Sequence, residues 1–227
     1  MNRLIHFRLC PRSRFVRLAL SELRIEVKLE EERPWDYRRE LLEINPAGEL
    51  PILCLDGVAP LCGSYAISEY LSESPERASP ALLPAGREQR AEVRRLIDWF
   101  NGKMLREVTQ PLIEEKVVSR FRAEGPRQPD AENLRAGRAN LRYHLGYIDF
   151  LAHDRSWLAG PEMSFADLAA AAHLSCLDYL GEIGWDEVAS ARQWYARMKS
   201  RPSLRAQLAE RVAGAPMPPA YYPDPDF

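Results

Sequence analysis

The sequence predicts a two-domain protein, an α/β domain followed by an all-helical domain. Strand and helix signals alternate over residues 1–75, and after residue 86 apolar residues recur only at helical spacing. Between them, residues 74–86 hold three prolines and little periodicity, which is typical of a linker. The chain has 227 residues, 46% hydrophobic and 28% charged, which is enough to bury a core in two modest domains.

Local signals predict the elements of the first domain. Pro34 stands where a proline opens a helix, Asp56-Gly57 is typical of a hairpin turn, and Ser64 is a candidate helix cap. The predicted order is βαβ followed by αββα, with elements at residues 3–7, 12–23, 25–29, 34–45, 51–55, 59–61 and 64–73.

The second domain is predicted to hold helices at residues 88–116, 131–152, 164–180, 190–200 and 203–212. Before the third helix, Ser164 can cap the first turn while Asp167 reaches back, which is the pattern of a capping box. His173 lies among alanines in the same helix, so we expect a core histidine rather than a ligand. The predicted domains are therefore 1–75 and 87–213, with a linker at 76–86 and an extended tail at 214–227.

Composition excludes several classes of function. The formal net charge is −2 with acids and bases well mixed, so we expect no nucleic-acid partner. No run of about 18 apolar residues occurs, which argues against a membrane span, and the N-terminus reads as a strand rather than a signal peptide. The four histidines and four cysteines lack metal-ligand spacing and form no CxxC pair, so we expect no metal and reduced thiols in the cytoplasm.

Two further patterns lie in the second half of the first domain. In Asn45-Pro46-Ala47-Gly48-Glu49-Leu50-Pro51, a proline stands directly before a predicted edge strand, where a cis peptide is frequent. That geometry would leave the backbone of Leu50 free to pair with an extended, peptide-like ligand. Ser64 then places a hydroxyl and the first amides of a helix at an N-terminus suited to anions.

Together with the capping box, these patterns resemble the cytosolic glutathione S-transferase family over residues 1 to 212. The resemblance implies a thioredoxin-like N-terminal domain, a helical C-terminal domain, a ligand cleft between them and a homodimer. It also implies that Leu50, Pro51 and Ser64 are the equivalents of the glutathione-binding residues.

Two residues at the start of the first helix are candidates for thiol chemistry. Cys10 stands where thiol-dependent members of the family carry their cysteine, and Arg12 and Arg14 nearby would favour its thiolate. Ser13 could instead donate a hydrogen bond to a bound thiolate. The alternative is that Cys10 is a small buried residue and Ser13 only a cap.

One position departs from the pattern of the family. Transferases usually carry an acid or glutamine just before the serine, where it contacts the charged end of glutathione, and here that residue is Gly63. A charge-assisted hydrogen bond is worth about 1.5–3 kcal/mol, so its loss would weaken glutathione binding by about one to two orders of magnitude.

Two segments suggest a protein partner. Arg33, Trp35 and Tyr37 cluster after the second strand, and tryptophan and arginine are enriched in interfaces. The tail holds five prolines with aromatic and acidic residues, Tyr221, Tyr222, Asp224, Asp226 and Phe227, which suits docking to a groove or basic pocket. In the alternative reading, Trp35 packs on its own domain and the tail packs back over the chain.

With these segments, the resemblance narrows to the FzlA family of glutathione-transferase-like division proteins of alphaproteobacteria. It implies binding to the tubulin-like protein FtsZ, bundling and curving of its filaments, and promotion of constriction, with no cofactor. It also implies contacts between the tail and other division proteins, and a cytoplasmic location at the division site. The alternative is a glutathione or thiol transferase that binds glutathione and uses Cys10 or Ser13.

Overall fold

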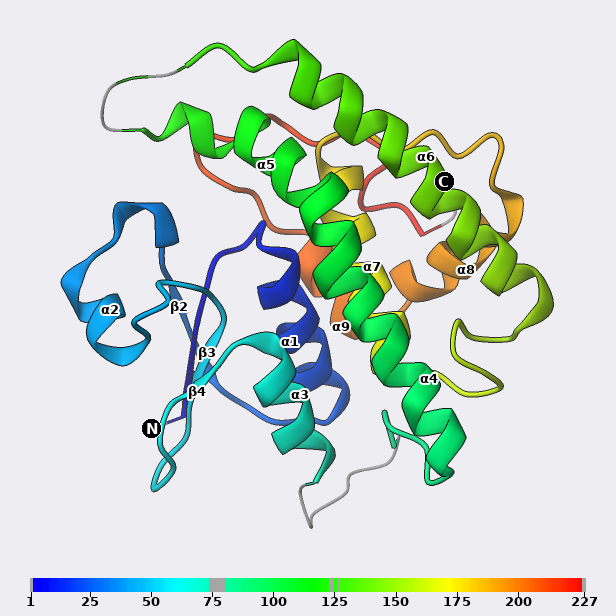
Figure 1. Ribbon diagram of the computed structural model, residues 1–227, viewed down its shortest axis with the longest axis horizontal. Helices are drawn as coiled ribbons and strands as arrows, with labels where there is room; N and C mark the ends of the chain where they lie inside the picture. The colour runs from blue at the N-terminus through cyan, green and yellow to red at the C-terminus, as the bar shows by residue number, and fades with distance from the viewer. Residues whose placement is uncertain (1, 74–80, 123–124, 126, 226–227) are drawn as a thin grey trace.

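The computed structural model describes residues 2–73, 81–122, 125 and 127–225. An α/β domain, blue to cyan in Figure 1, lies against a helical domain, green to orange, which confirms the predicted fold class. Residues 76–80 of the predicted linker lie outside the described residues. Its remainder packs onto the second domain, because Leu82 is buried and its carbonyl accepts the amide of Phe165 at 2.9 Å.

The sheet holds β1 (Arg3–His6), β2 (Lys28–Glu31), β3 (Ile52–Cys54) and β4 (Leu61–Cys62) in the order β2-β1-β3-β4. β1 pairs parallel with β2, and the helix α1 (Pro11–Glu22) connects these two strands along the chain. β1 also pairs antiparallel with β3. Leu4 of β1 stands opposite Leu29 and Leu53; Leu4 and Leu53 are buried, whereas Leu29 on the outer strand β2 is exposed. The prediction that Pro51 precedes an edge strand is wrong, because β4 folds back through a hairpin and covers the outer side of β3.

The predicted helix at 34–45 is interrupted. It consists of the 3₁₀ turn η1 (Pro34–Asp36) and the helix α2 (Arg39–Ile44). Tyr37 between them has a φ of 45°, a left-handed conformation that a right-handed helix cannot continue through. The second strand also begins three residues later than predicted, at Lys28.

The helical domain is built on one long rod formed by α4 (Arg87–Asp98), the π-helix η2 (Trp99–Thr109) and α5 (Gln110–Lys116). The rod crosses the front of the molecule beside α3 (Ser64–Ser72) in Figure 1. The remaining helical elements are η3 (Val118–Arg120), α6 (Ala131–Asp154), α7 (Phe165–Tyr179), α8 (Ala189–Lys199) and α9 (Pro202–Leu208). Within the described residues, no helix combines the length and apolarity needed to cross a membrane.

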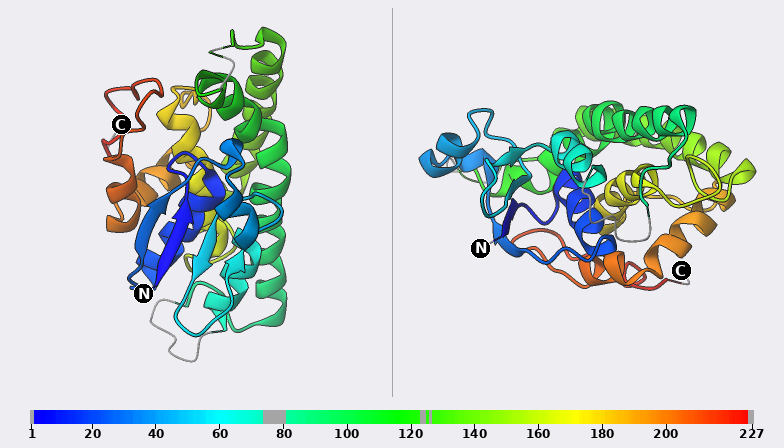
Figure 2. Two further views of the ribbon diagram at one scale, coloured as in Figure 1. Left: turned by 90° about the vertical axis from the view of Figure 1, so that its left-hand side faces the viewer. Right: turned by 90° about the horizontal axis from the view of Figure 1, so that it is seen from below.

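Helix α7 lies at the centre of the molecule. All of its residues are buried, and it packs on α1 of the first domain as well as on the rod. The two views of Figure 2 show α7 enclosed between the sheet domain and the other helices. This central helix therefore ties the two domains into one packed unit.

The predicted capping box at the start of α7 is confirmed. The Ser164 hydroxyl accepts the amide of Ala166 at 3.2 Å, and the Asp167 carboxylate accepts the amide of Ser164 at 3.0 Å. Asp167 also accepts the amide of Leu158 at 2.9 Å and the indole N–H of Trp194 at 3.0 Å. One buried carboxylate thus holds the helix start, the preceding loop and α8 together.

His173 is a core histidine, as predicted. Its side chain is fully buried, with Nδ1 2.8 Å from the Thr109 hydroxyl and Nε2 3.1 Å from Asn101 Oδ1. Burial lowers the pKa of His173 from 6.5 to about 3. The folded state therefore binds fewer protons than the unfolded state below pH 6.5, and stability falls as the pH decreases.

We expect a His173→Gln variant to lose part of this acid sensitivity. Each pKa unit is worth about 1.4 kcal/mol, so His173 should cost the wild type about 2 kcal/mol between pH 7.5 and pH 5. Urea unfolding of the wild type and of the variant at both pH values measures how much stability each protein loses between pH 7.5 and pH 5. Burial also lowers the pKa of His6 and of His144, but both residues are present in the two proteins, so their effects cancel. Equal decreases in both proteins would show that His173 does not carry the effect.

Candidate functional site

A cleft of about 320 Å³ lies between the two domains. Its walls come from the loop between β1 and α1, the turns around α2, and the inner side of η2, α5 and η3. Most of the lining is apolar, including Phe7, Trp35, Leu105 and Ile113. This is the place where the sequence predicts a ligand cleft, and its size suits a small molecule or a few side chains.

Cys10 lines the cleft at the N-cap position of α1 and is half-buried with a free thiol. The two arginines predicted to support its thiolate lie differently from each other. Arg12 lines the cleft and donates to Glu49 at 2.9 Å. Arg14 is fully buried and points away from the cleft into the interior, so only Arg12 stands beside Cys10 at the cleft.

Ser13 does not line the cleft. Its side chain is fully buried, and its hydroxyl accepts the backbone amide of Phe7 at 3.4 Å. Ser13 therefore satisfies a local backbone donor. It is not the helix cap of the alternative reading either, because Cys10 holds the cap position of α1 and no side chain bonds the helix start. A ligand thiolate in the cleft would not reach this hydroxyl in the present conformation.

The predicted glutathione-site equivalents, Leu50, Pro51 and Ser64, are not among the residues that line the cleft, although the adjacent Glu49 is. The Leu50-Pro51 peptide is cis, and Leu50 is buried just before the first paired residue of β3. Ser64 is also buried, but it occupies the first helical position rather than the cap. The prediction that Ser64 caps the helix is wrong, because Gly63 holds the cap position and no side chain bonds the helix start.

Gly63 has a φ of 88° and a ψ of 147°, a backbone conformation accessible essentially only to glycine. Open space surrounds its α-carbon, since a β-carbon there would meet no atom within 4 Å. The position therefore offers no side chain to the amino-acid end of glutathione. The cleft also carries the carboxylates of Glu49 and Glu114, each of which is bonded to an arginine, Glu49 to Arg12 and Glu114 to Arg122.

The predicted partner segment at 33–37 has an exposed edge and a buried centre. Arg33 and Tyr37 are exposed, Tyr37 by 69%. Trp35 is half-buried between the domains, with its ring 4.9 Å from Phe7 and stacked 5.9 Å from Phe121. Trp35 therefore packs against both domains, and Arg33 and Tyr37 remain available to a partner.

The described part of the tail is anchored to the body of the protein. Tyr222 is fully buried, its hydroxyl accepts Arg14 Nη1 at 2.9 Å, and its ring meets Tyr179 edge-on at 5.4 Å. Burial raises the pKa of Tyr222 to about 12. Tyr222 is therefore an internal anchor and not a partner-binding residue, whereas Tyr221 and Asp224 are exposed. Asp226 and Phe227 lie outside the described residues.

The structural roles of two residues in this region were not identified from the sequence. Phe121 follows a short helical turn beside a polar loop, and no local pattern marks its contact with Trp35. Arg14 stands among other arginines of the first helix, and its burial depends on α7 and the tail, which are distant in sequence. Within the described part of the chain, no group of three metal-ligating side chains is present.

Comparisons with known proteins cover the whole chain. A family profile described as glutathione S-transferase, N-terminal domain, matches residues 4–80. The chain is 43% identical to FtsZ-localized protein A of Caulobacter vibrioides over 98% of its own length and 96% of that protein. The solved structure of FzlA from C. crescentus has a TM-score of 0.92 at 43% identity, covering 100% of this chain and 99% of that one.

A second solved structure, described as a glutathione S-transferase from Sinorhizobium meliloti, has a TM-score of 0.94 at 47% identity, with both chains covered completely. Both domains of the present chain therefore have counterparts in these proteins.

Proposed function

This chain belongs to the family of FtsZ-localized protein A, which has the glutathione S-transferase fold, and on that basis we propose that it is a non-catalytic division protein that binds FtsZ. The similarity along nearly the entire chain is the observation that carries the proposal. The proposed activity is to bundle and curve FtsZ filaments and so to promote constriction. Its proposed location is the cytoplasm at the division site, where its tail contacts other division proteins.

The ligand cleft supports a non-catalytic role. Gly63 supplies no side chain to a charged ligand, and Ser13 is occupied by a backbone amide. The loss of a charge-assisted hydrogen bond of about 1.5–3 kcal/mol would leave glutathione weakly held. A protein partner, by contrast, needs only accessible side chains such as Arg33 and Tyr37.

Co-sedimentation with FtsZ polymers tests this proposal. The protein at micromolar concentration is mixed with FtsZ and GTP, and the pellet is compared with one from FtsZ kept unpolymerised with GDP. Enrichment in the polymer pellet is the expected result. The absence of enrichment at saturating FtsZ would contradict the proposal.

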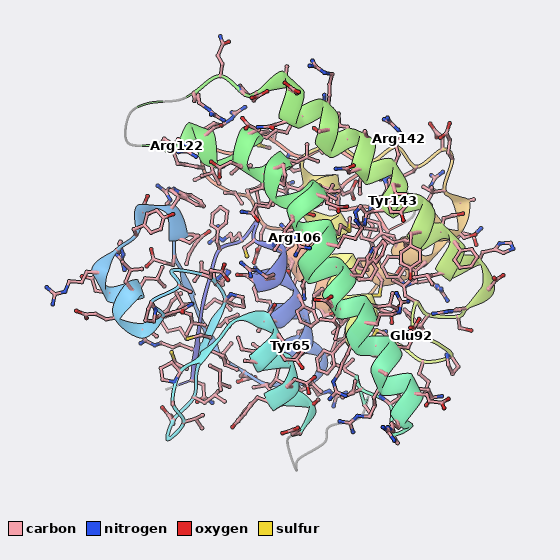
Figure 3. The ribbon with its side chains drawn as sticks, in the orientation of Figure 1. Tyr65, Glu92, Arg106, Arg122, Arg142 and Tyr143 are labelled. Atoms are coloured by element: carbon pink, nitrogen blue, oxygen red, sulfur yellow. The ribbon has the colours of Figure 1, made fainter. Side chains whose placement is uncertain are left out.

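We propose further that the chain forms a homodimer through the side formed by α3, the rod and α6. Three exposed aromatic side chains lie on α3 and α6, with Tyr65 exposed by 62%, Tyr143 by 63% and Phe150 by 62%. Phe150 follows Tyr143 by seven residues, about two helical turns, and so shares its face of α6. Figure 3 shows Tyr65 over α3 and Tyr143 over α6, with Arg106 of the rod between them. A dimer presents two copies of one weak filament-binding surface. Once one copy has bound a filament, the other is held nearby at a high effective concentration and could bind a neighbouring filament.

A Tyr143→Glu substitution is expected to convert the dimer to a monomer, because it places a charge at an apolar contact. Self-association should weaken by at least about tenfold, the effect of losing about 1.4 kcal/mol at one interface position. Light scattering after size-exclusion chromatography measures the mass. Met217→Glu, at a residue that is 77% exposed on the tail segment, is the control and should remain dimeric. A dimeric Tyr143→Glu variant would exclude this side as the interface.

A transferase activity is the second candidate, and the half-buried thiol of Cys10 in the cleft favours it. Retention on immobilised glutathione followed by a conjugation assay tests it, with Cys10→Ala as the control. A protein that shows neither retention nor turnover would eliminate this candidate.

A further inference from the structure

Phe121 contacts two segments that are distant in sequence. On one side, its ring stacks 5.9 Å from Trp35, with the Arg33 guanidinium 4.6 Å above the same ring. On the other side, the chain at Gly214 passes so close that a β-carbon there would lie 2.8 Å from Phe121 Cε1. Such a distance is too short for any side chain, so the approach requires glycine, which also adopts a φ of 79° there.

The segment that includes Gly214 is fixed at both ends. The backbone amide of Val212 donates to the Tyr179 hydroxyl at 3.2 Å, and Tyr222 is held by Arg14 at 2.9 Å. Both anchoring tyrosines are buried. Residues 212–222, which we call the strap, are therefore clamped to the body on either side of their contact with Phe121.

A second chain of contacts joins the strap to Trp35. Arg14, which holds Tyr222, also donates from Nε to the carbonyl of Arg8 at 2.7 Å. The neighbouring residue Phe7 meets the Trp35 ring edge-on at 4.9 Å. Two separate routes, one through Phe121 and one through Arg14, thus lead from the strap to Trp35.

We propose that the strap and the face formed by Arg33, Trp35 and Tyr37 are coupled, with Phe121 as the positioning residue between them. A partner that binds the strap would change the affinity of that face for its own partner, and the reverse effect is equal in size. That the partner of the face is FtsZ rests on the function proposed above. The coupling between the strap and the face is a property of this chain and does not depend on which partner binds.

Hydrogen exchange measured by mass spectrometry tests the coupling without any partner. In a Gly214→Ala variant, the added methyl group pushes on Phe121, and exchange of amides 33–39 should rise by about 2- to 30-fold, the usual range for mutations along a coupling route. Gly57→Ala is the matched control. Gly57 has nearly the same φ, 78°, but a β-carbon there meets no atom within 4 Å.

Tyr222→Phe provides a second variant that removes only the phenol oxygen and its bond to Arg14. It should raise exchange in residues 212–222 and also in 33–39. The proposal would be overturned if amides 33–39 of this variant exchanged at the wild-type rate while the strap exchanged faster. Tyr222→Phe gives this answer even if Gly214→Ala does not fold. Failure of FtsZ to bind would affect only the proposed function, since this readout contains no FtsZ.

Discussion

Replacement of both Arg33 and Tyr37 by alanine is expected to weaken binding to FtsZ filaments by about 30-fold or more. Interface residues of these types often contribute more than 1 kcal/mol each, and two such losses correspond to about that change in affinity. Neither side chain belongs to the core, because both are exposed in the free protein. The fold should therefore remain intact, with the urea midpoint lowered only slightly by loss of the Arg33 contact with the Phe121 ring, which is worth about 0.5–1 kcal/mol.

Trp35 is a poorer test of the same surface. Its ring packs against Phe7 and Phe121, so a Trp35→Ala variant would open a gap between the two domains as well as alter the surface. Arg205→Ala, on the exposed side of α9, is a suitable control for the double variant. Wild-type co-sedimentation by a folded Arg33→Ala/Tyr37→Ala protein would show that FtsZ binds elsewhere.

An Asp167→Ala substitution is expected to lower the free energy of unfolding by about 3–5 kcal/mol, because it leaves several buried donors unsatisfied at about 1–3 kcal/mol each. The Asp167 carboxylate is fully buried and accepts four donors, the amide and hydroxyl of Ser164, the amide of Leu158 and the indole N–H of Trp194. Alanine leaves all four donors without an acceptor in the interior.

Urea unfolding measures this loss, and Asp186→Ala is the control because Asp186 is exposed in the loop between α7 and α8. We expect the control to change stability by less than about 0.5 kcal/mol, as is usual for surface positions. A loss below about 1 kcal/mol in Asp167→Ala would mean that water satisfies the four donors and that the capping box contributes little.

The sequence was most informative where the determining contacts are local. The capping box depends on Ser164 and Asp167, which are three residues apart, and the order of strands and helices follows from short apolar patterns. The prediction of a continuous helix at residues 34–45 was wrong because a single backbone angle decides the outcome there. No apolar pattern shows that Tyr37 adopts a left-handed conformation and interrupts a helix.

The sequence was also uninformative where distant segments meet. The aromatic and acidic composition of the tail left two interpretations open, docking to a partner and packing back over the chain, because burial of Tyr222 depends on Arg14 and Tyr179 from two other helices. The stacking of Phe121 on Trp35 likewise depends on how the two domains pack. Both contacts require the tertiary arrangement before either partner can be identified.

The central claim is that the glutathione subsite of this fold lacks its charged anchor at Gly63 and that the outer surface carries the function instead. Calorimetric titration of the wild-type protein with glutathione tests the claim most directly. We predict binding weaker than about 1 mM, because the missing hydrogen bond is worth about one to two orders of magnitude in affinity. Saturable one-to-one binding tighter than about 50 µM would contradict it.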